Sequence, residues 1–227
     1  MNASALEALH DGLSDPEIAR RIAAGDENAL QLLMRRHNQT LHRTARSILK
    51  DDVEAEDAVQ EAYLLAYRSI GSFRGEARLS TWLVRIVVNE SIARLRRRTR
   101  HAEVIQVGGG VATGDGESME LPEHAAMRGE VRRLLEAKID ALPDAFRTVF
   151  MLRGIEDFTV EEAAKSLGIP EATVRTRFFR AKGLLRESIA REIDGAFQDA
   201  FAFDGARCDR IVESVLAKIR TECAAGT

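Results

Sequence analysis

Each of the four prolines in this chain stands at the start of a stretch with helical periodicity. Pro16, Pro122, Pro143 and Pro170 each precede apolar residues that recur three or four positions apart. Proline is tolerated in the first turn of a helix but disrupts helix interiors and central strands. Aromatic residues make up only 5% of the chain, so large β-sheets are poorly supported. The chain is therefore predicted to be all-α.

Length and composition limit the class of protein further. With 227 residues and 45% hydrophobic content, the chain can bury one or two modest cores. The first 15 residues lack the continuous apolar core of a signal peptide, and no run approaches the ~18 residues of a membrane span. We therefore expect a cytoplasmic protein with no membrane insertion. Cys208 and Cys223 form neither a disulfide framework nor a paired metal motif, so we expect no cofactor and no metal.

The stretch 73–98 joins a short glycine-containing loop to a cationic helix. Between residues 74 and 100, eight arginines accompany only two glutamates, which gives a net charge of +6. Arginines neutralise phosphates, and Phe73 and Trp82 offer aromatic surfaces for an unstacked base, so the stretch suits a nucleic acid. The alternative is an arginine-rich helix end that complements the helix dipole. For Trp82 itself, its place on an apolar stripe favours a core position.

The stretch 51–61 has the opposite charge. It holds six acidic residues and no basic residue, a net charge of −6. Opposite patches on one chain indicate one anionic and one cationic partner, although a solubilising acidic face explains the same composition. His37 and His42 lie five positions apart on a predicted helix, which does not place them on one face. We interpret them as partly exposed helix residues rather than metal ligands.

Residues 159–191 have the pattern of a helix-turn-helix. Thr159 and Glu162 form a capping box that opens a short helix, Gly168 supplies the turn, and Pro170 starts a basic helix. Residues 175–191 carry a net charge of +5. The second helix is expected to enter the major groove of DNA. Its predicted core side consists of Val174, Phe178, Leu184 and Leu185. The residues presented to DNA by its first half are Arg175, Thr176, Arg177, Phe179 and Arg180.

The amino-acid sequences of these stretches resemble one protein family. The run SFRGEARLSTWLVRIVVNESIARLRR, residues 72–97, resembles the promoter-melting segment of bacterial extracytoplasmic-function sigma factors, the specificity subunits of RNA polymerase. Residues 57–63 resemble the family's polymerase-clamp helix, and 142–186 its second DNA-binding domain. The resemblance covers roughly residues 15–190 in the family's order. It implies a region-two domain at 15–101, a flexible acidic glycine-rich linker at 102–127, a region-four domain at 128–190, and a helical C-terminal extension at 191–227.

The resemblance also implies roles for individual residues. Those expected to bind the clamp of core polymerase are Asp57, Gln60 and Glu61. Those expected to bind and melt the minus-ten element are Phe73, Arg74, Ser80, Trp82, Asn89, Arg94 and Arg97. The predicted contacts with the minus-thirty-five element come from Arg175, Thr176, Arg177, Phe179 and Arg180. Asparagine both donates and accepts hydrogen bonds, which suits Asn89 for reading a base edge, although an ordinary polar helix residue is the alternative.

The implied function is that of a sigma factor. Such a protein binds core RNA polymerase, recognises a two-part promoter, melts the DNA without chemistry of its own and serves stress-responsive transcription, usually under an anti-sigma protein. The alternative is a helix-turn-helix regulator that binds DNA without core polymerase. An enzyme is disfavoured, because the sequence offers no nucleophile-base pairing, phosphate-cradling glycine loop or metal-ligand spacing.

The tail beyond residue 191 carries a second amphipathic pattern. On a helix starting at Ala206, the apolar stripe consists of Cys208, Val212, Val215, Ile219 and Cys223. We interpret the cysteines as small buried hydrophobes rather than a redox switch, because a helix separates them by ~22 Å. The stripe is expected to dock onto this chain's own DNA-binding domains, or onto a polymerase or anti-sigma surface.

Overall fold

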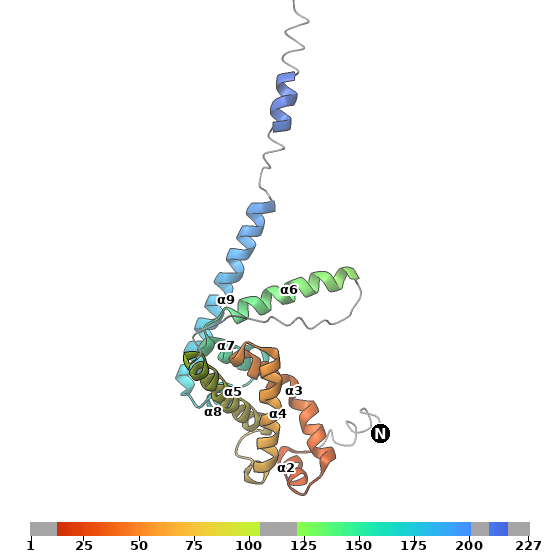
Figure 1. Ribbon diagram of the computed structural model, residues 1–227, viewed down its shortest axis with the longest axis vertical. Helices are drawn as coiled ribbons and strands as arrows, with labels where there is room; N and C mark the ends of the chain where they lie inside the picture. Colours follow the sequence, from red (N-terminus) through yellow and green to blue (C-terminus); the bar gives the residue numbers. More distant parts are fainter. Residues whose placement is uncertain (1–12, 105–121, 201–208, 218–227) are drawn as a thin grey trace, which may run out of the picture. The chain divides into compact units, whose positions relative to one another are not determined.

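The computed structural model describes residues 13–104, 122–200 and 209–217, with side chains described for 13–100, 129–194 and 209–217. Every regular element within these ranges is helical (Figure 1), which confirms the all-α prediction. The predicted linker, 102–127, lies mostly outside the described residues. Its two ends belong to helices, because α5 continues to Val104 and α6 begins at Pro122.

The order of elements follows the sequence patterns. The helices are α2 (Asp15–Ala23), α3 (Glu27–Leu49), α4 (Asp52–Ser69), α5 (Leu79–Val104), α6 (Pro122–Asp140), α7 (Asp144–Phe150), α8 (Val160–Leu167) and α9 (Glu171–Ala200). A 3₁₀ turn, η1 (Ile70–Ser72), follows α4, and a π-helical segment, η2 (Met151–Ile155), follows α7. One further helix covers 209–217.

Local capping explains where several helices begin and end. The Asp26 carboxylate accepts hydrogen bonds from the backbone N–H groups of Asn28 and Ala29 at the start of α3. Thr159 and Glu162 form the predicted capping box of α8, and Gly168 ends that helix with a left-handed φ of 64°. Caps satisfy backbone groups that a helix terminus otherwise leaves without partners. These boundaries follow from short-range sequence and could be predicted for that reason.

Asp15 caps a distant helix rather than its own. The run Asp15-Pro16-Glu17 predicts Asp15 as the N-cap of α2, but the N-cap position is Ser14, so that prediction was wrong and Asp15 lies in the first turn. Its carboxylate instead accepts a hydrogen bond of 2.7 Å from the backbone N–H of Leu79, the first residue of α5. Asp15 therefore caps a helix that begins 64 residues later in the chain. This long-range cap fixes the start of α5 against α2.

Helices α3, α4 and α5 pack side by side around an apolar core (Figure 1). Leu33 and Leu41 of α3 and Leu83 and Val87 of α5 are almost fully buried. Each such side chain contributes about 1.5–3 kcal/mol relative to leaving it exposed. The buried side of α4 carries small residues that allow close helix approach: Ala55, Ala58, Ala62 and Ala66. The core therefore holds the exposed faces of α4 and α5 in fixed positions.

The helix-turn-helix shares this core. Val149, Leu152, Phe158 and Val174 belong to the same cluster of buried residues as the α3–α5 core. A second, smaller cluster is formed by Leu142, Ala181 and Leu185, with Ile139, Phe146 and Phe150 packed against it. Both expected DNA-binding regions therefore lie in one compact unit, Met1–Leu185.

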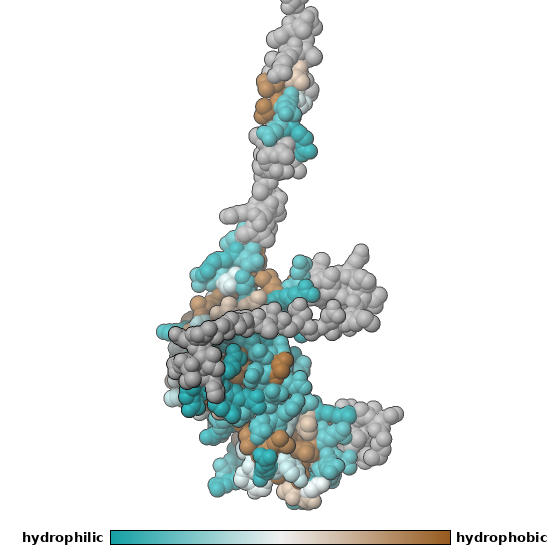
Figure 2. All heavy atoms as spheres, in the orientation of Figure 1, coloured by the Kyte–Doolittle hydropathy of each residue, from teal (hydrophilic) through white to brown (hydrophobic). Residues whose placement is uncertain are grey.

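The second compact unit is Arg186–Thr227. Its described helix over 209–217 exposes Ile211, Val212, Val215 and Leu216. Hydrophobic and hydrophilic residues lie on different sides of this helix (Figure 2). The predicted amphipathic pattern is confirmed there, whereas Cys208 and Cys223 lie outside the described residues. No helix in the described ranges is long and apolar enough to cross a membrane.

Candidate nucleic-acid interface

The acidic helix α4 presents its predicted residues on one exposed face. The side chains of Asp57 and Glu61 are 56% and 38% exposed, and Gln60 lies exposed between them. Spacings of three and four residues place all three on one side of the helix. The structure therefore brings together the three residues assigned to polymerase binding.

Apolar residues extend this acidic face, and the sequence reasoning missed them. Val53, Leu64 and Tyr67 are 72%, 50% and 49% exposed. Together with Asp57 and Gln60 they recur four, three, four and three positions apart along α4. An apolar surface with a carboxylate and an amide at its centre suits a protein partner better than it suits solvent. The spacing was visible in the sequence, but periodicity alone does not separate an exposed stripe from a buried one.

Arg94 connects α5 to the acidic helix. Its guanidinium contacts the carboxylates of Glu90 at 2.8 Å, Glu54 at 3.6 Å and Asp57 at 3.9 Å. It also donates a 3.2 Å hydrogen bond to the backbone carbonyl of Asp57. Because these acids largely neutralise it, Arg94 positions α4 rather than presenting a free cation. Arg97 contacts Glu90 at 3.0 Å yet remains 56% exposed. The assignment of both arginines to minus-ten DNA stays a prediction.

Phe73 of the loop before α5 lies against Trp82 of α5 itself. The rings of Phe73 and Trp82 lie 5.7 Å apart between centroids and are tilted by 59°. Both side chains are partly buried against the core, so Trp82 packs as the apolar stripe indicated while keeping an exposed edge. Arg74 is 82% exposed. The loop ends at Arg78 and α5 begins at Leu79, so Ser80 stands in the first turn of α5.

Asn89 lies further along α5 on its exposed side. It is two helical turns beyond Trp82, so both side chains project from the same half of the helix. The predicted minus-ten residues thus fall in three places. These are the loop and first turns of α5 with the Phe73–Trp82 pair, the exposed side of α5 at Asn89, and the part of α5 where Arg94 and Arg97 contact Glu90.

A cleft of about 530 Å³ opens beside the loop. It is lined by Phe73, Gly75 and Arg78 of the loop, by Thr159 at the N-cap of α8, and by Glu162 and Lys165 along that helix. Arg78 Nη1 lies 3.4 Å from Glu162 Oε1 across this space. Partial burial raises the pKa of Glu162, but hydrogen bonds with Thr159 and the hydrogen bond and charge of Arg78 outweigh it and leave that pKa below its ordinary value. Glu162 is therefore a stable anion at neutral pH.

The first half of α9 presents the predicted minus-thirty-five face. Arg175, Thr176, Phe179 and Arg180 are exposed, and Phe179 reaches 76%, while Arg177 is partly buried. Arg175 Nη2 lies 2.5 Å from the carboxylate of Glu171 in the preceding turn. A large exposed aromatic residue among arginines is unfavourable in solvent and suits contact with DNA. The structure thus places four of the five predicted residues on an open surface.

The opposite side of α9 follows the prediction with one exception. Val174 and Leu185 are buried, and Phe178 packs on Phe150 with ring centroids 6.2 Å apart. Lys182 Nζ lies 4.7 Å from the centroid of the Phe178 ring. Leu184 is 39% exposed, so its predicted core position was wrong. The buried positions recur at four, three and four residues through Ala181, and Leu184 falls about 100° around the helix from Leu185.

Known proteins share these elements. The family models that match are Sigma-70 region 2 over residues 33–101 and Sigma-70, region 4 over residues 132–185. The RNA polymerase sigma-H factor of Pseudomonas aeruginosa is 32% identical over 191 residues, which cover 82% of this chain and 97% of that protein. The ECF RNA polymerase sigma factor SigM of Mycobacterium tuberculosis is 34% identical over 76% of this chain and 83% of its own length.

Solved structures share the fold. CnrH, solved in complex with the cytosolic domain of CnrY, has a TM-score of 0.53 at 24% identity and covers 83% of this chain and 99% of its own. RpoE of Bartonella quintana, solved with the anti-sigma factor NepR, has a TM-score of 0.57 at 23% identity, with 70% and 96% covered. Two family models in their expected order and relatives above 30% identity lead to one conclusion: the chain belongs to the extracytoplasmic-function family of RNA polymerase sigma factors.

Proposed function

We propose that this chain directs core RNA polymerase to a two-part promoter through three separate surfaces. The exposed face of α4 binds the polymerase, the 73–80 loop with α5 captures the minus-ten element, and the first half of α9 reads the minus-thirty-five element. In this proposal residues 15–101 and 128–190 are the two functional domains. One observation supports the proposal most. The same chain holds an exposed face of acidic and apolar residues on α4 and two cationic elements with aromatic residues, the 73–80 loop with α5 and the first half of α9.

The α4 face supports polymerase binding by its chemistry. Carboxylates at Asp57 and Glu61 suit basic donors on a partner, and the exposed Val53, Leu64 and Tyr67 suit apolar burial at the same interface. Electrostatic complementarity steers encounter and fixes register, whereas buried apolar anchors supply most of the affinity. A regulator that binds DNA alone needs no such face, so this surface favours the sigma factor over the alternative.

The remaining properties follow from this role. We infer that the chain catalyses no reaction and needs no cofactor, because the polymerase performs the chemistry and this chain supplies recognition. It acts in the cytoplasm, where the polymerase and the promoter are. An anti-sigma protein is an expected further partner, since RpoE of Bartonella quintana was solved bound to the anti-sigma factor NepR.

In vitro transcription separates the two candidate functions. Purified chain is added to core polymerase and a promoter library, and transcripts are mapped. A sigma factor yields promoter-specific starts that need both components, and permanganate detects unpaired thymines at the minus-ten element. If the chain is instead a regulator that does not bind polymerase, the chain alone protects DNA in a footprint. It then produces no promoter-specific transcript when it is mixed with core polymerase. The second outcome would reject the proposal.

A further inference from the structure

The helix that carries most of the predicted minus-ten residues begins without a local cap. Arg78 occupies the N-cap position of α5, because its carbonyl accepts the first hydrogen bond of the helix from the backbone N–H of Trp82 at 3.2 Å. An arginine side chain only donates hydrogen bonds, so it cannot satisfy the free N–H groups of the first turn. Helices α3, α4 and α8 instead begin at local caps, which are Asp26, Asp51 and Thr159. The start of α5 therefore depends on an acceptor from elsewhere in the chain.

Asp15 of α2 supplies that acceptor. Its Oδ2 accepts the 2.7 Å hydrogen bond from the backbone N–H of Leu79, whose side chain is fully buried. A carboxylate at a helix N-terminus is favoured by the helix dipole as well as by the hydrogen bond itself. Helix α2 is anchored in the core by Ile18 and Ile22, which are almost fully buried. The position of the Asp15 carboxylate is thus set by the core and not by the loop that precedes α5.

The residue after Asp15 contacts the middle of that loop, residues 73–78. Gly75 has a left-handed φ of 72°, and a Cβ added to it would lie 3.7 Å from Pro16 Cγ. Helix α2 also contacts the 3₁₀ turn η1. The carbonyl of Ile70 in this turn accepts a 3.0 Å hydrogen bond from the backbone N–H of Phe73, where the loop begins. Helix α2 therefore supports the loop at its beginning, in its middle and at its end.

The aromatic pair depends on where α5 begins. Trp82 lies one turn beyond Leu79 on the same helix, and its ring lies 5.7 Å from that of Phe73 between centroids. A displaced first turn of α5 would move Trp82 relative to Phe73. Asp15 and Pro16 also line the cleft that Phe73 lines. The carboxylate of Asp15 is therefore connected through a single hydrogen bond to the surface that we propose receives the minus-ten strand.

A cap that only stabilises the fold would make a similar bond, and Asp26 provides the comparison. Its carboxylate accepts hydrogen bonds from the backbone N–H groups of Asn28 and Ala29 at 3.0 and 3.1 Å. Those partners lie within three residues of Asp26, at the start of its own helix. The Asp15 bond instead spans 64 residues and ends on the residue where the loop becomes a helix. The two caps should stabilise the chain by similar amounts, but only Asp15 restrains the loop.

We propose that Asp15 is a positioning residue for capture of the minus-ten strand, because its bond to Leu79 holds the loop and the first turns of α5 in the arrangement that receives an unstacked base. This inference rests on the proposed function. It gives α2, which precedes the residues matched by the region 2 model, a role in strand capture. Asp15 acts through the loop and does not itself touch DNA or polymerase. A loop that is already ordered binds more tightly, because less ordering remains to be done on binding.

Four variants separate positioning from stability. Asp15→Ala removes the acceptor. Asp15→Ser is a second loss variant, because its hydroxyl is too short to reach Leu79, and it keeps a polar residue in the first turn of α2 if the alanine variant folds poorly. Asp15→Asn keeps an oxygen acceptor at the same reach without the charge. The matched control is Asp26→Ala, which removes the capping carboxylate of α3 at a similar cost in stability.

The first readout is the fluorescence of the free full-length protein. Trp82 is the only tryptophan of the chain, so its emission reports on the start of α5 directly. We expect Asp15→Ala and Asp15→Ser to shift this emission to longer wavelength and to increase its quenching by acrylamide, because the ring becomes more accessible to water. Asp15→Asn and Asp26→Ala should keep the emission and the quenching of the wild type.

The second readout is the affinity of the holoenzyme for a labelled single-stranded oligonucleotide with the non-template minus-ten sequence of a transcribed promoter. We expect Asp15→Ala and Asp15→Ser to bind this strand about fivefold more weakly, because loss of a cap lowers the fraction of molecules with an ordered loop by about this factor. Asp15→Asn should recover most of the affinity, and Asp26→Ala should match the wild type. Affinity for core polymerase should be the same in all of them, because the α4 face is unchanged.

Wild-type emission and strand affinity in both Asp15→Ala and Asp15→Ser would overturn the positioning role. An equal loss of strand affinity in Asp26→Ala would also overturn it, since that result would show a general effect of lower stability. Transcription by the wild-type holoenzyme reports the proposed function separately. If the wild type starts no transcripts, the proposed function fails, whereas normal transcription beside unaffected Asp15 variants rejects only the role of Asp15.

Discussion

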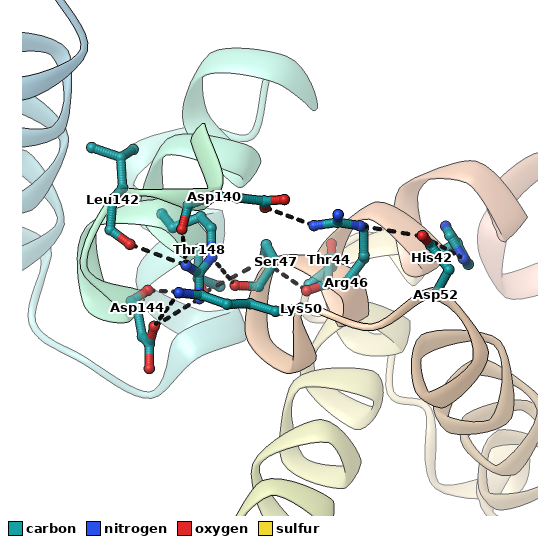
Figure 3. A network of polar contacts seen from close by, with 11 residues as sticks. His42, Thr44, Arg46, Ser47, Lys50, Asp52, Asp140, Leu142, Asp144 and Thr148 are labelled. Atoms are coloured by element: carbon teal, nitrogen blue, oxygen red, sulfur yellow. Dashed lines mark hydrogen bonds and ion pairs between the residues drawn. The ribbon is translucent and has the colours of Figure 1, made fainter. Parts of the chain in front are cut away.

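At the scale of the residue, Arg147 is the side chain whose role was hardest to foresee. In the sequence it is one arginine within a short apolar helix. In the structure it is fully buried and donates hydrogen bonds to the carbonyl of Ser47, 100 residues earlier in the chain, and to the nearby carbonyls of Asp140 and Leu142 (Figure 3). The caps at Asp26 and Thr159 were predictable, because their partners lie within three residues. Arg147, and likewise Asp15 at the start of α5, have partners that only the folded chain brings near.

Removing Arg147 should therefore destabilise the protein strongly. Arg147→Met keeps much of the volume but leaves the Ser47, Asp140 and Leu142 carbonyls without this donor, so we expect the free energy of unfolding to fall by about 3 kcal/mol. Arg132→Met is the control, since Arg132 is 74% exposed and its ion pair with Glu136 lies within its own helix. Its effect should stay below about 0.5 kcal/mol. Equal losses in urea denaturation would contradict the structural role of Arg147.

His37 makes stability depend on pH. Burial lowers its pKa most strongly, Asp15 opposes this, and Arg36 and Arg78 lower it further. The unfolded chain therefore binds the proton more readily than the folded chain, and stability falls as pH drops below the ordinary histidine value of about 6.5. We expect a lower free energy of unfolding at about pH 5.5 than at about pH 7.5. His37→Gln should reduce the dependence of the free energy of unfolding on pH, and His42→Gln should leave it unchanged. If His37→Gln also leaves it unchanged, another group causes the pH dependence.

At the scale of the element, helical periodicity located most of the exposed face of α9. It separated the exposed Arg175, Phe179 and Arg180 from the buried Val174 on α9. Periodicity failed at Leu184, which lies next to the buried stripe of α9. Over a short stretch of sequence, such a neighbouring apolar residue cannot be told from a residue of the stripe. Periodicity also gave no sign that Val53 and Leu64 on α4 are exposed, since that depends on which helices cover which face.

Substitutions in the two elements that we propose contact DNA should affect different steps of transcription initiation. Arg180→Ala should cost about 1–3 kcal/mol of promoter affinity and relax upstream specificity, if Arg180 pairs with a base. Asn89→Ala should instead reduce strand opening while closed-complex affinity stays nearly constant. Permanganate footprinting and competition binding with the holoenzyme distinguish these steps, with Arg132→Ala as a control on exposed α6 surface. Normal melting by the Asn89 variant would remove this residue from base capture.

At the scale of the whole molecule, the order of functional regions could be predicted but their packing could not. The resemblance placed the melting element before the helix-turn-helix, and both family models match in that order. The contact of α8 with α5 joins residues about 85 positions apart through Ser166 and Thr81. Contacts at such separation leave no periodic signal in one sequence.

The C-terminal tail should modulate the molecule rather than define its activity. The helix at 209–217 exposes four large apolar side chains, which favours docking on another surface. Truncation after Arg191 should therefore alter transcription, partner binding or solubility, whereas Cys208→Ser with Cys223→Ser should leave any oxidant response unchanged. The full chain serves as reference in transcription and light-scattering assays. A truncated protein that matches it in every assay would identify the tail as passive.

The affinity of the chain for core RNA polymerase tests the central assignment most directly. Asp57→Arg with Glu61→Arg reverses the charge of the exposed α4 face, and Glu130→Arg with Glu136→Arg makes the same change in net charge on the exposed surface of α6. We expect the α4 variant to lose at least about 100-fold in affinity for core, and transcription with it, because like charges oppose at the interface. The control variant should bind as the wild type does. Unchanged affinity of the α4 variant, with its fold intact by circular dichroism, would contradict the assignment of this face to the polymerase.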